Sequence, residues 1–115
     1  MKIKIDFVTN SSSTAFIITN ISEKPKTLVD FVKENPQLLK QFLKIYNWHT
    51  DLSRYNQRNL IKSAMDLDIT FTPIDRKYCV FGDEDGTLIG EVFDYMLRDG
   101  GSSESFDWRF CEYLR

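Results

Sequence analysis

The chain has 115 residues, of which 42% are hydrophobic and 14% aromatic, and its formal net charge at pH 7 is −2. This length fits one domain, and the aromatic content is enough to fill a core, which excludes a disordered chain. No window holds the roughly 18 uninterrupted apolar residues of a membrane helix, and the amino terminus lacks the apolar run of a signal peptide. We therefore expect a single cytoplasmic domain over residues 1–115 with no membrane partner.

The amino-terminal segment has the pattern of two strands. Residues 2–8 alternate charged and apolar side chains, which is typical of a half-buried strand. Residues 9–13 are turn formers, and residues 14–21 resume a β-rich run. The sequence therefore predicts a hairpin in which these two strands are joined by the serine-rich turn.

Three helices are predicted next. Thr27 is a candidate cap for a short helix with apolar residues at helical spacing. Asn35 and Pro36 are residue types favoured at a helix start, so we expect a second helix over residues 36–47. We expect a third helix over residues 52–66.

The second half of the chain returns to strands. Residues 69–72 and 78–81 predict a second hairpin, residues 87–98 an amphipathic helix, and residues 106–111 a closing strand. The order is then ββ–ααα–ββ–α–β. Because the strands come in hairpins and not in βαβ units, we expect an α+β fold with a mainly antiparallel sheet and about four helices on one face.

Residues 6–17 read DFVTNSSSTAFI. This string resembles the opening of a set of short uncharacterised bacterial and phage proteins, which begin with a few charged residues, then Phe-Val-Ser/Thr-Asn, serines and Phe-Ile or Phe-Val. The resemblance covers residues 1–18 and brings no activity with it. It implies a prokaryotic or mobile-element origin.

The serine loop, Asn10, Ser11, Ser12 and Ser13, has two interpretations. Short hydroxyl and amide side chains satisfy the backbone of a turn, which is the structural interpretation. The alternative is a binding or modification site, in which backbone N–H groups point at an anion. The loop contains no glycine and no lysine of a phosphate-binding loop, and this favours the turn.

The basic stripe consists of Arg54, Arg58 and Lys62, which follow one another at i, i+4 and i+8 and so lie along one ridge of the predicted third helix. With Trp48 and Tyr55 close by, such a stripe could hold a nucleic-acid backbone and stack bases. The alternative is an ordinary solvated helix face. A pI of about 5.3 is unlike that of most nucleic-acid-binding domains.

The acidic segment, residues 83–94, contains five carboxylates: Asp83, Glu84, Asp85, Glu91 and Asp94. A calcium-binding loop in this register would require ligands at Phe81 and Val92, which cannot supply them. One histidine and two cysteines also fall short of a zinc site. We therefore expect no metal and no cofactor, and interpret the segment as a charged surface.

Few residues suggest catalysis. His49 is the only histidine, and Asp51 lies two residues after it, so the two could form an acid–base pair. A packing role for His49 is favoured. Cys79 and Cys111 lie in predicted strands, where we expect two buried hydrophobic residues, the alternative being a facing pair able to bridge. No sequence feature indicates a lowered pKa for Cys79.

Residues 1–65 carry ten Lys/Arg against five Asp/Glu (+5), and residues 66–115 carry five against twelve (−7). This asymmetry, together with the absence of a catalytic motif, favours a non-enzymatic protein-binding module, with inhibition of a host defence or regulatory machine as a more specific hypothesis. The expected binding surfaces are the basic stripe, the acidic segment and the serine loop. The alternatives are nucleic-acid binding through the basic stripe, a small enzyme using His49 or Cys79, and a homodimer pairing the two charged halves.

Overall fold

The structure is a computed structural model, and it describes residues 13–45, 54–82 and 87–114. Within these ranges the chain forms four helices and six strands. In chain order they are β2 (Ser13–Asn20), β3 (Lys26–Thr27), α2 (Leu28–Glu34), α3 (Pro36–Ile45), α4 (Gln57–Leu67), β4 (Thr70–Phe71), β5 (Asp75–Phe81), α5 (Leu88–Met96), β6 (Gly101–Ser102) and β7 (Phe106–Leu114).

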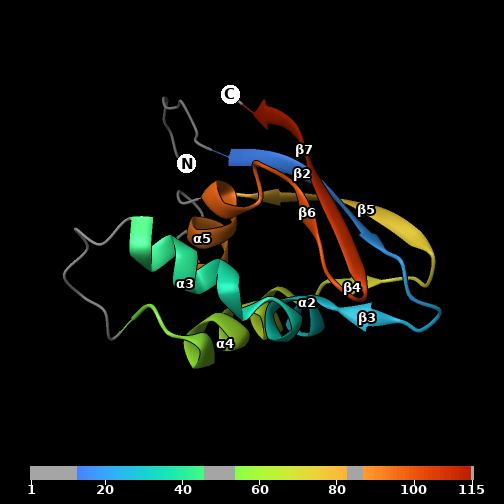
Figure 1. Ribbon diagram of the computed structural model, residues 1–115, viewed down its shortest axis with the longest axis horizontal. Helices are drawn as coiled ribbons and strands as arrows, with labels where there is room; N and C mark the ends of the chain where they lie inside the picture. Colours follow the sequence, from blue (N-terminus) through green and yellow to red (C-terminus); the bar gives the residue numbers. More distant parts are fainter. Residues whose placement is uncertain (1–12, 46–53, 83–86, 115) are drawn as a thin grey trace.

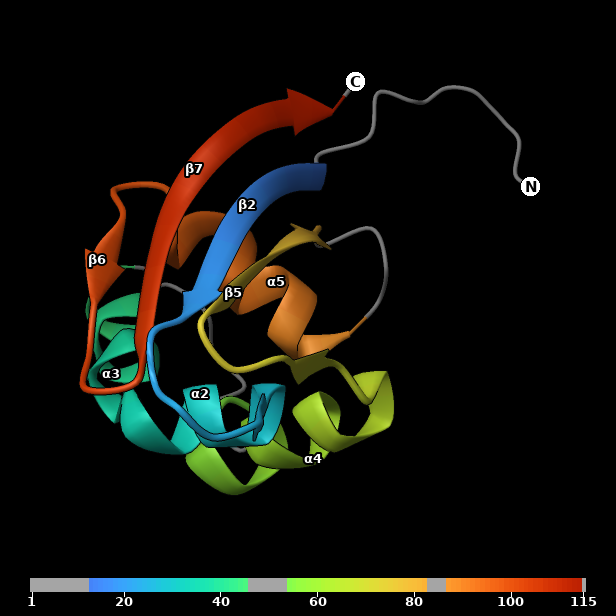
Figure 2. The ribbon, with the colours of Figure 1, turned by 90° about the vertical axis from the view of Figure 1, so that its right-hand side faces the viewer.

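Four strands form an antiparallel sheet in the order β5–β2–β7–β6, and β3 pairs separately with β4. Figure 1 shows the helices gathered on one side of the larger sheet, and Figure 2 shows α5 running beneath its strands. The α+β class with an antiparallel sheet, predicted from the sequence, is therefore confirmed. No helix in the described residues is long and apolar enough to cross a membrane.

Strand β2 is one of the two internal strands of the sheet, the other being β7. It pairs with β5 on one edge, from Thr14 opposite Phe81 to Asn20 opposite Asp75, and with β7 on the other edge. The predicted strand over residues 2–8 lies outside the described residues. Because both edges of β2 are already paired over residues 14–20, the prediction that this segment pairs with a strand immediately before it in a hairpin is wrong.

The second predicted hairpin, between residues 69–72 and 78–81, is also wrong. Thr70 and Phe71 pair with Thr27 and Lys26, whereas β5 joins the larger sheet beside β2. The change of sheet occurs at Ile74, whose N–H donates to the Ser22 carbonyl at 3.1 Å and whose φ is 51°. A left-handed residue at this point turns the chain away from β4, so β5 continues in a different sheet.

Local sequence signals explain the helix ends. Thr27 caps α2 in a capping box with Asp30, as its residue type predicts. The second helix begins at Pro36 as predicted, but the Asn35 side-chain amide donates to the Phe31 carbonyl at 3.0 Å, so this side chain completes the end of α2. The third helix begins only at Gln57, because the Asn56 side chain accepts from the Asn59 N–H and caps it there.

Most of the buried hydrophobic residues of the described chain form one cluster between the sheet and the helices. Phe31 of α2 lies near its middle, with its ring centroid 5.4 Å from that of Phe93, 5.1 Å from that of Phe106 and 5.2 Å from that of Trp108. All three contacts are edge-to-face, which is a favourable geometry for aromatic pairs. One aromatic residue thus joins α2, α5 and β7.

The opposite face of the sheet is open. Tyr78 and Val80 of β5 are 49% and 40% exposed on it. The Tyr78 hydroxyl donates to Glu112 Oε2 of β7 at 3.0 Å, across the intervening strand β2. The helices thus cover the inner face, in agreement with the alternation of buried and partly buried residues from Phe16 to Asn20 along β2.

Replacing Ile74 by asparagine is expected to raise the free energy of unfolding by about 1 kcal/mol. Ile74 is 65% exposed and has a left-handed φ, which a β-branched residue tolerates poorly and asparagine tolerates well. Thermal or urea denaturation measures the change. The control is Ile21→Asn, another exposed isoleucine without a positive φ, which we expect to change stability by less than about 0.5 kcal/mol. A loss of stability in Ile74→Asn would show that Ile74 packs usefully in the turn.

Candidate functional site

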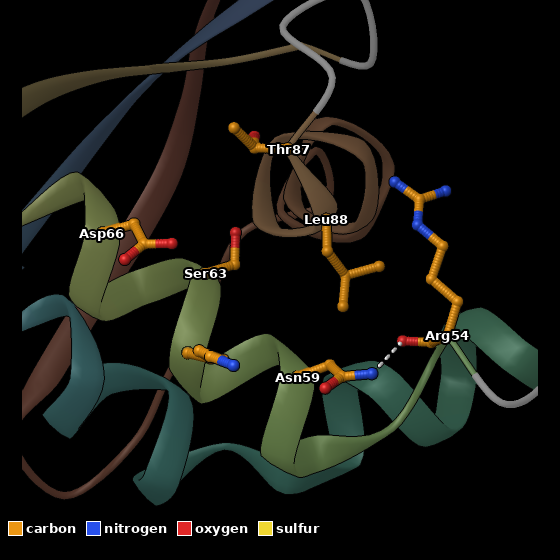
Figure 3. A pocket seen from close by; sticks show the side chains of 7 residues that line it. Arg54, Asn59, Ser63, Asp66, Thr87 and Leu88 are labelled. Carbon is orange, nitrogen blue, oxygen red and sulfur yellow. Dashed lines mark hydrogen bonds between the residues drawn. The ribbon is translucent and has the colours of Figure 1, made fainter.

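A hollow of about 360 Å³ opens between α4 and the start of α5, and we call it the α4–α5 hollow. Figure 3 shows the side chains that line it. Four of them come from α4, two from the start of α5 and one from the residues before α4: Asn59, Lys62, Ser63, Asp66, Thr87, Leu88 and Arg54. The hollow therefore combines cationic, anionic, amide, hydroxyl and apolar groups.

The amphipathic pattern of α4 forms one wall. Asn59, Ser63 and Asp66 recur at i, i+4 and i+7, which places them on one face of the helix, while Leu60 and Ala64 are buried in the core on another. Ser63 Oγ accepts from the Ile89 N–H at 3.2 Å, in the first turn of α5. The same helix face that lines the hollow therefore also holds the amino-terminal end of α5 in place.

The start of α5 forms the other wall. Thr87 caps the helix, and its hydroxyl accepts from the Gly90 N–H at 3.0 Å. Leu88 is only 7% exposed, and Figure 3 shows its side chain projecting into the space beside α4. It supplies an apolar surface among otherwise polar side chains.

A charged cluster borders the hollow. Arg54 Nη1 lies 3.2 Å from Glu91 Oε1, and the Tyr55 hydroxyl donates to Glu91 Oε2 at 2.7 Å. The Arg54 guanidinium also lies over the Tyr55 ring, 5.3 Å from its centroid. Burial raises the pKa of Tyr55, and the hydrogen bond to Glu91 raises it further. The tyrosine therefore stays protonated at neutral pH and orients the carboxylate toward Arg54.

The structure separates the residues of the basic stripe. Arg54 precedes α4, so the prediction of a single helical ridge is wrong for this residue. Lys62 lines the hollow with Arg54, whereas Arg58 is exposed on α4 outside the hollow. The cause is the Asn56 cap, which starts the helix after Arg54.

The acidic segment is not one surface either. Asp83, Glu84 and Asp85 lie outside the described residues, and Glu91 pairs with Arg54. Asp94 is fully buried, so its prediction as a surface binding residue is wrong. Its Oδ1 accepts from the Thr14 hydroxyl at 2.5 Å and lies 3.1 Å from Arg98 Nη2. This carboxylate holds α5 against β2.

In the serine loop, Asn10, Ser11 and Ser12 lie outside the described residues. Ser13 begins β2, opposite Leu114 of β7. It packs so closely against Gly82 that a Cβ at position 82 would lie 2.5 Å from Ser13 Oγ. The described end of the loop is therefore part of the sheet.

Five residues of the hollow were not predicted from the sequence: Asn59, Ser63, Asp66, Thr87 and Leu88. A usable signal was present on α4, where the polar residues at i, i+4 and i+7 form a stripe on the third helix. No sequence signal places Thr87 and Leu88 beside that stripe. Their proximity results from helix packing.

The cysteines differ in environment. Cys79 of β5 is buried, and burial raises the pKa of its thiol to about 11. Cys111 is exposed, so the prediction of two buried cysteines is wrong for it. The register of β2 against β7 shifts between Ala15, opposite Glu112, and Phe16, opposite Phe110, so Cys111 is the extra residue of an irregular strand. Both thiols are free, and no bridge joins them.

His49 lies outside the described residues.

We expect a thiol reagent at pH 7.5 to label one cysteine of the native protein rapidly, because Cys111 is exposed, whereas Cys79 is buried and burial raises the pKa of its thiol to about 11. Denaturation should expose the second thiol. Mass spectrometry of the labelled chain counts the modified residues, and Cys111→Ser should remove the rapid phase. Fast labelling of Cys79 in that variant would contradict the burial of its thiol and would revive its role as a nucleophile.

No group of three or more His, Cys, Asp or Glu side chains suited to a metal ion occurs in the described ranges. Comparisons with known protein families, with curated proteins and with solved structures each find no match to this chain. The function must therefore be inferred from the residues and their geometry.

Proposed function

We propose that this protein is a non-enzymatic, protein-binding module whose contact surface is the α4–α5 hollow. The observation that carries the proposal is the composition of the hollow, where Lys62 and Asp66 stand beside the small exposed edge of Leu88. Protein interfaces combine an apolar centre with a polar rim in this way. Both walls are helices, and the hydrogen bond from Ile89 to Ser63 holds them together.

The charges indicate the kind of partner. Lys62 is an exposed cation, whereas Arg54 is held over Tyr55 by Glu91 and presents its guanidinium at the edge of the hollow. A partner segment with a carboxylate directed at Lys62 and an aliphatic side chain directed at Leu88 would match these groups. Such charge pairs contribute mostly to specificity and to the rate of association.

Nucleic-acid binding is less well supported. It would need several cations free to contact phosphates, but Arg54 is paired with Glu91 and the hollow itself contains Asp66. The overall pI of about 5.3 adds repulsion of a polyanion. The exposed Arg58 and Lys62 remain the residues that such binding would use.

The resemblance of residues 6–17 to the openings of short bacterial and phage proteins supports a more specific version of this proposal. In it, the module acts in the cytoplasm of a bacterial host and blocks a defence or regulatory machine. A homodimer through the same hollow is the competing arrangement. Size-exclusion chromatography with light scattering separates the two, because the dimer predicts twice the monomer mass and the host-partner proposal predicts a monomer.

The experiment is an affinity purification from bacterial lysate with three tagged proteins, analysed by mass spectrometry. They are the native sequence, Lys62→Glu and the matched control Lys40→Glu, whose lysine is exposed on α3 and lies outside the hollow. We expect a stoichiometric protein that survives nuclease treatment, is retained by Lys40→Glu, and is reduced at least about tenfold by Lys62→Glu, because a favourable charge pair becomes a repulsive one.

Two results would overturn the proposal. Equal recovery of the partner by native protein and Lys62→Glu would place the interface elsewhere. Recovery that disappears after nuclease treatment, and that weakens steeply with salt, would instead assign nucleic-acid binding to Arg58 and Lys62.

A further inference from the structure

A second pocket, of about 420 Å³, lies at the other end of α5 and is separate from the α4–α5 hollow. We call it the α3–α5 pocket, because its walls are α3, the last turn of α5, and the strands β6 and β7 that follow. The residues that matter for its chemistry are Gln37, Leu38, Gln41, Tyr95, Met96 and Trp108. Pockets of this volume are typical of small-molecule sites.

Trp108 gives this pocket its most informative feature. The side chain is 4% exposed, and within the described residues its indole Nε1–H has no hydrogen-bond acceptor. Buried indole N–H groups usually find a partner, and an unpaired buried donor destabilises the folded state. Trp108 also lines the pocket, so an acceptor on a bound molecule would supply the missing partner.

Two glycines pack against Trp108. Gly101 lies against the edge of the indole, where a Cβ would be 2.6 Å from Trp108 Cζ2 and 3.2 Å from Nε1. Gly100 precedes it with a φ of 74°. Both glycines line the pocket. Neither glycine carries a side chain, so their backbone packs directly against the indole, and an acceptor reaches the buried N–H only if this backbone shifts.

The remaining lining residues define the ligand. Gln37 and Gln41 each offer an amide that donates and accepts, and Leu38 and Met96 offer apolar surface. The charged residue of the lining is Asp99, and the lining residues include no lysine or arginine, so an anionic ligand is disfavoured. A neutral molecule avoids this repulsion and can still accept a hydrogen bond from the indole.

We infer that the α3–α5 pocket binds a small uncharged molecule in which an amide-type carbonyl stands beside an apolar or flat body. The carbonyl accepts from Trp108 Nε1–H, and the glutamine amides pair with the remaining polar atoms. Two kinds of molecule carry these groups: an uncharged nucleoside, and a peptide that ends in an amidated amino acid.

The test follows the indole resonance of Trp108 by ¹H–¹⁵N NMR. Trp48→Phe leaves Trp108 as the only tryptophan and so assigns its signal. The probes are uridine and N-acetyl-leucinamide, titrated separately. We expect at least one of them to shift the Trp108 indole N–H in a saturable way. A shift with uridine alone assigns the nucleoside class, and a shift with N-acetyl-leucinamide alone assigns the peptide class.

Matched substitutions on α3 locate the binding. Gln41→Ala should weaken the responding probe about 3- to 10-fold, the effect of losing one hydrogen bond. Lys40→Ala changes the neighbouring exposed residue outside the pocket and should leave the affinity unchanged. The dispersion of the amide spectrum verifies that both variants are folded.

Three outcomes would overturn the inference: no shift with either probe up to its solubility limit, a shift that does not saturate, or equal affinities in Gln41→Ala and the parent protein. Lys62→Glu should leave probe binding intact, because Lys62 lines the other cavity. The inference and the proposed protein-binding function can therefore fail independently.

Discussion

Replacing Phe31 by alanine is expected to lower the free energy of unfolding by about 3–5 kcal/mol. Phe31 is fully buried, and its ring contacts Phe93, Phe106 and Trp108 edge-to-face. Truncation removes all three ring contacts and leaves a cavity that rigid neighbours on α5 and β7 fill only partly. A domain of ordinary stability, about 5–15 kcal/mol, would lose a large fraction of it.

Urea denaturation followed by circular dichroism measures this loss, with Lys33→Ala as the control on the same helix. Lys33 is exposed, so its truncation should change stability by less than about 0.5 kcal/mol. A loss below about 1.5 kcal/mol for Phe31→Ala would mean that the core repacks around the missing ring, contrary to the cost of large-to-small substitutions in rigid cores.

Replacing Asn20 by alanine is expected to cost about 2–4 kcal/mol, although it removes only a small polar side chain. Asn20 is fully buried at the end of β2. Its Nδ2 donates to the carbonyls of Lys24 at 2.8 Å and Phe71 at 3.2 Å. Its Oδ1 accepts from Ser22 N–H at 2.9 Å and from the Ser22 hydroxyl at 2.7 Å. Alanine would remove all four hydrogen bonds, and the Phe71 carbonyl would lose the Asn20 donor in a buried position.

The same denaturation measurement on Thr19→Ala provides the control, because Thr19 is the neighbouring residue of β2 and its side chain lies on the other face of the sheet. Asn20→Asp adds a second comparison: it keeps the acceptor for Ser22 and loses both donated bonds, so we expect it to be destabilised as well. If Asn20→Ala were no less stable than Thr19→Ala, the connection from β2 to Phe71 of β4 would be dispensable.

The helices were the most predictable elements. The cap at Thr27 and the start at Pro36 depend on residues within one turn of the helix end, so the local sequence predicts them. The third helix shows the limit of periodicity. Its apolar spacing extends back beyond Gln57, but the Asn56 side chain caps the helix there and leaves Arg54 outside it.

The candidate site was predictable only in part. Lys62 and Arg54 were predicted as binding residues and do line the α4–α5 hollow, whereas Arg58 does not. Glu91 was predicted in the acidic segment and lies beside them through its pairing with Arg54. Trp108 lies in the closing strand predicted over residues 106–111, and only the unmet hydrogen bond of its indole marks the α3–α5 pocket.

The α+β class and the approximate positions of the helices follow from local sequence patterns, because periodicity and capping depend on residues a few positions apart. The tertiary structure alone decided which strands pair, since β2 takes β5 and β7 as partners and β4 takes β3. It also decided that Asp94 is buried against Thr14, a residue 80 positions away. Contacts at such separations depend on how the whole chain packs, and no local pattern records them.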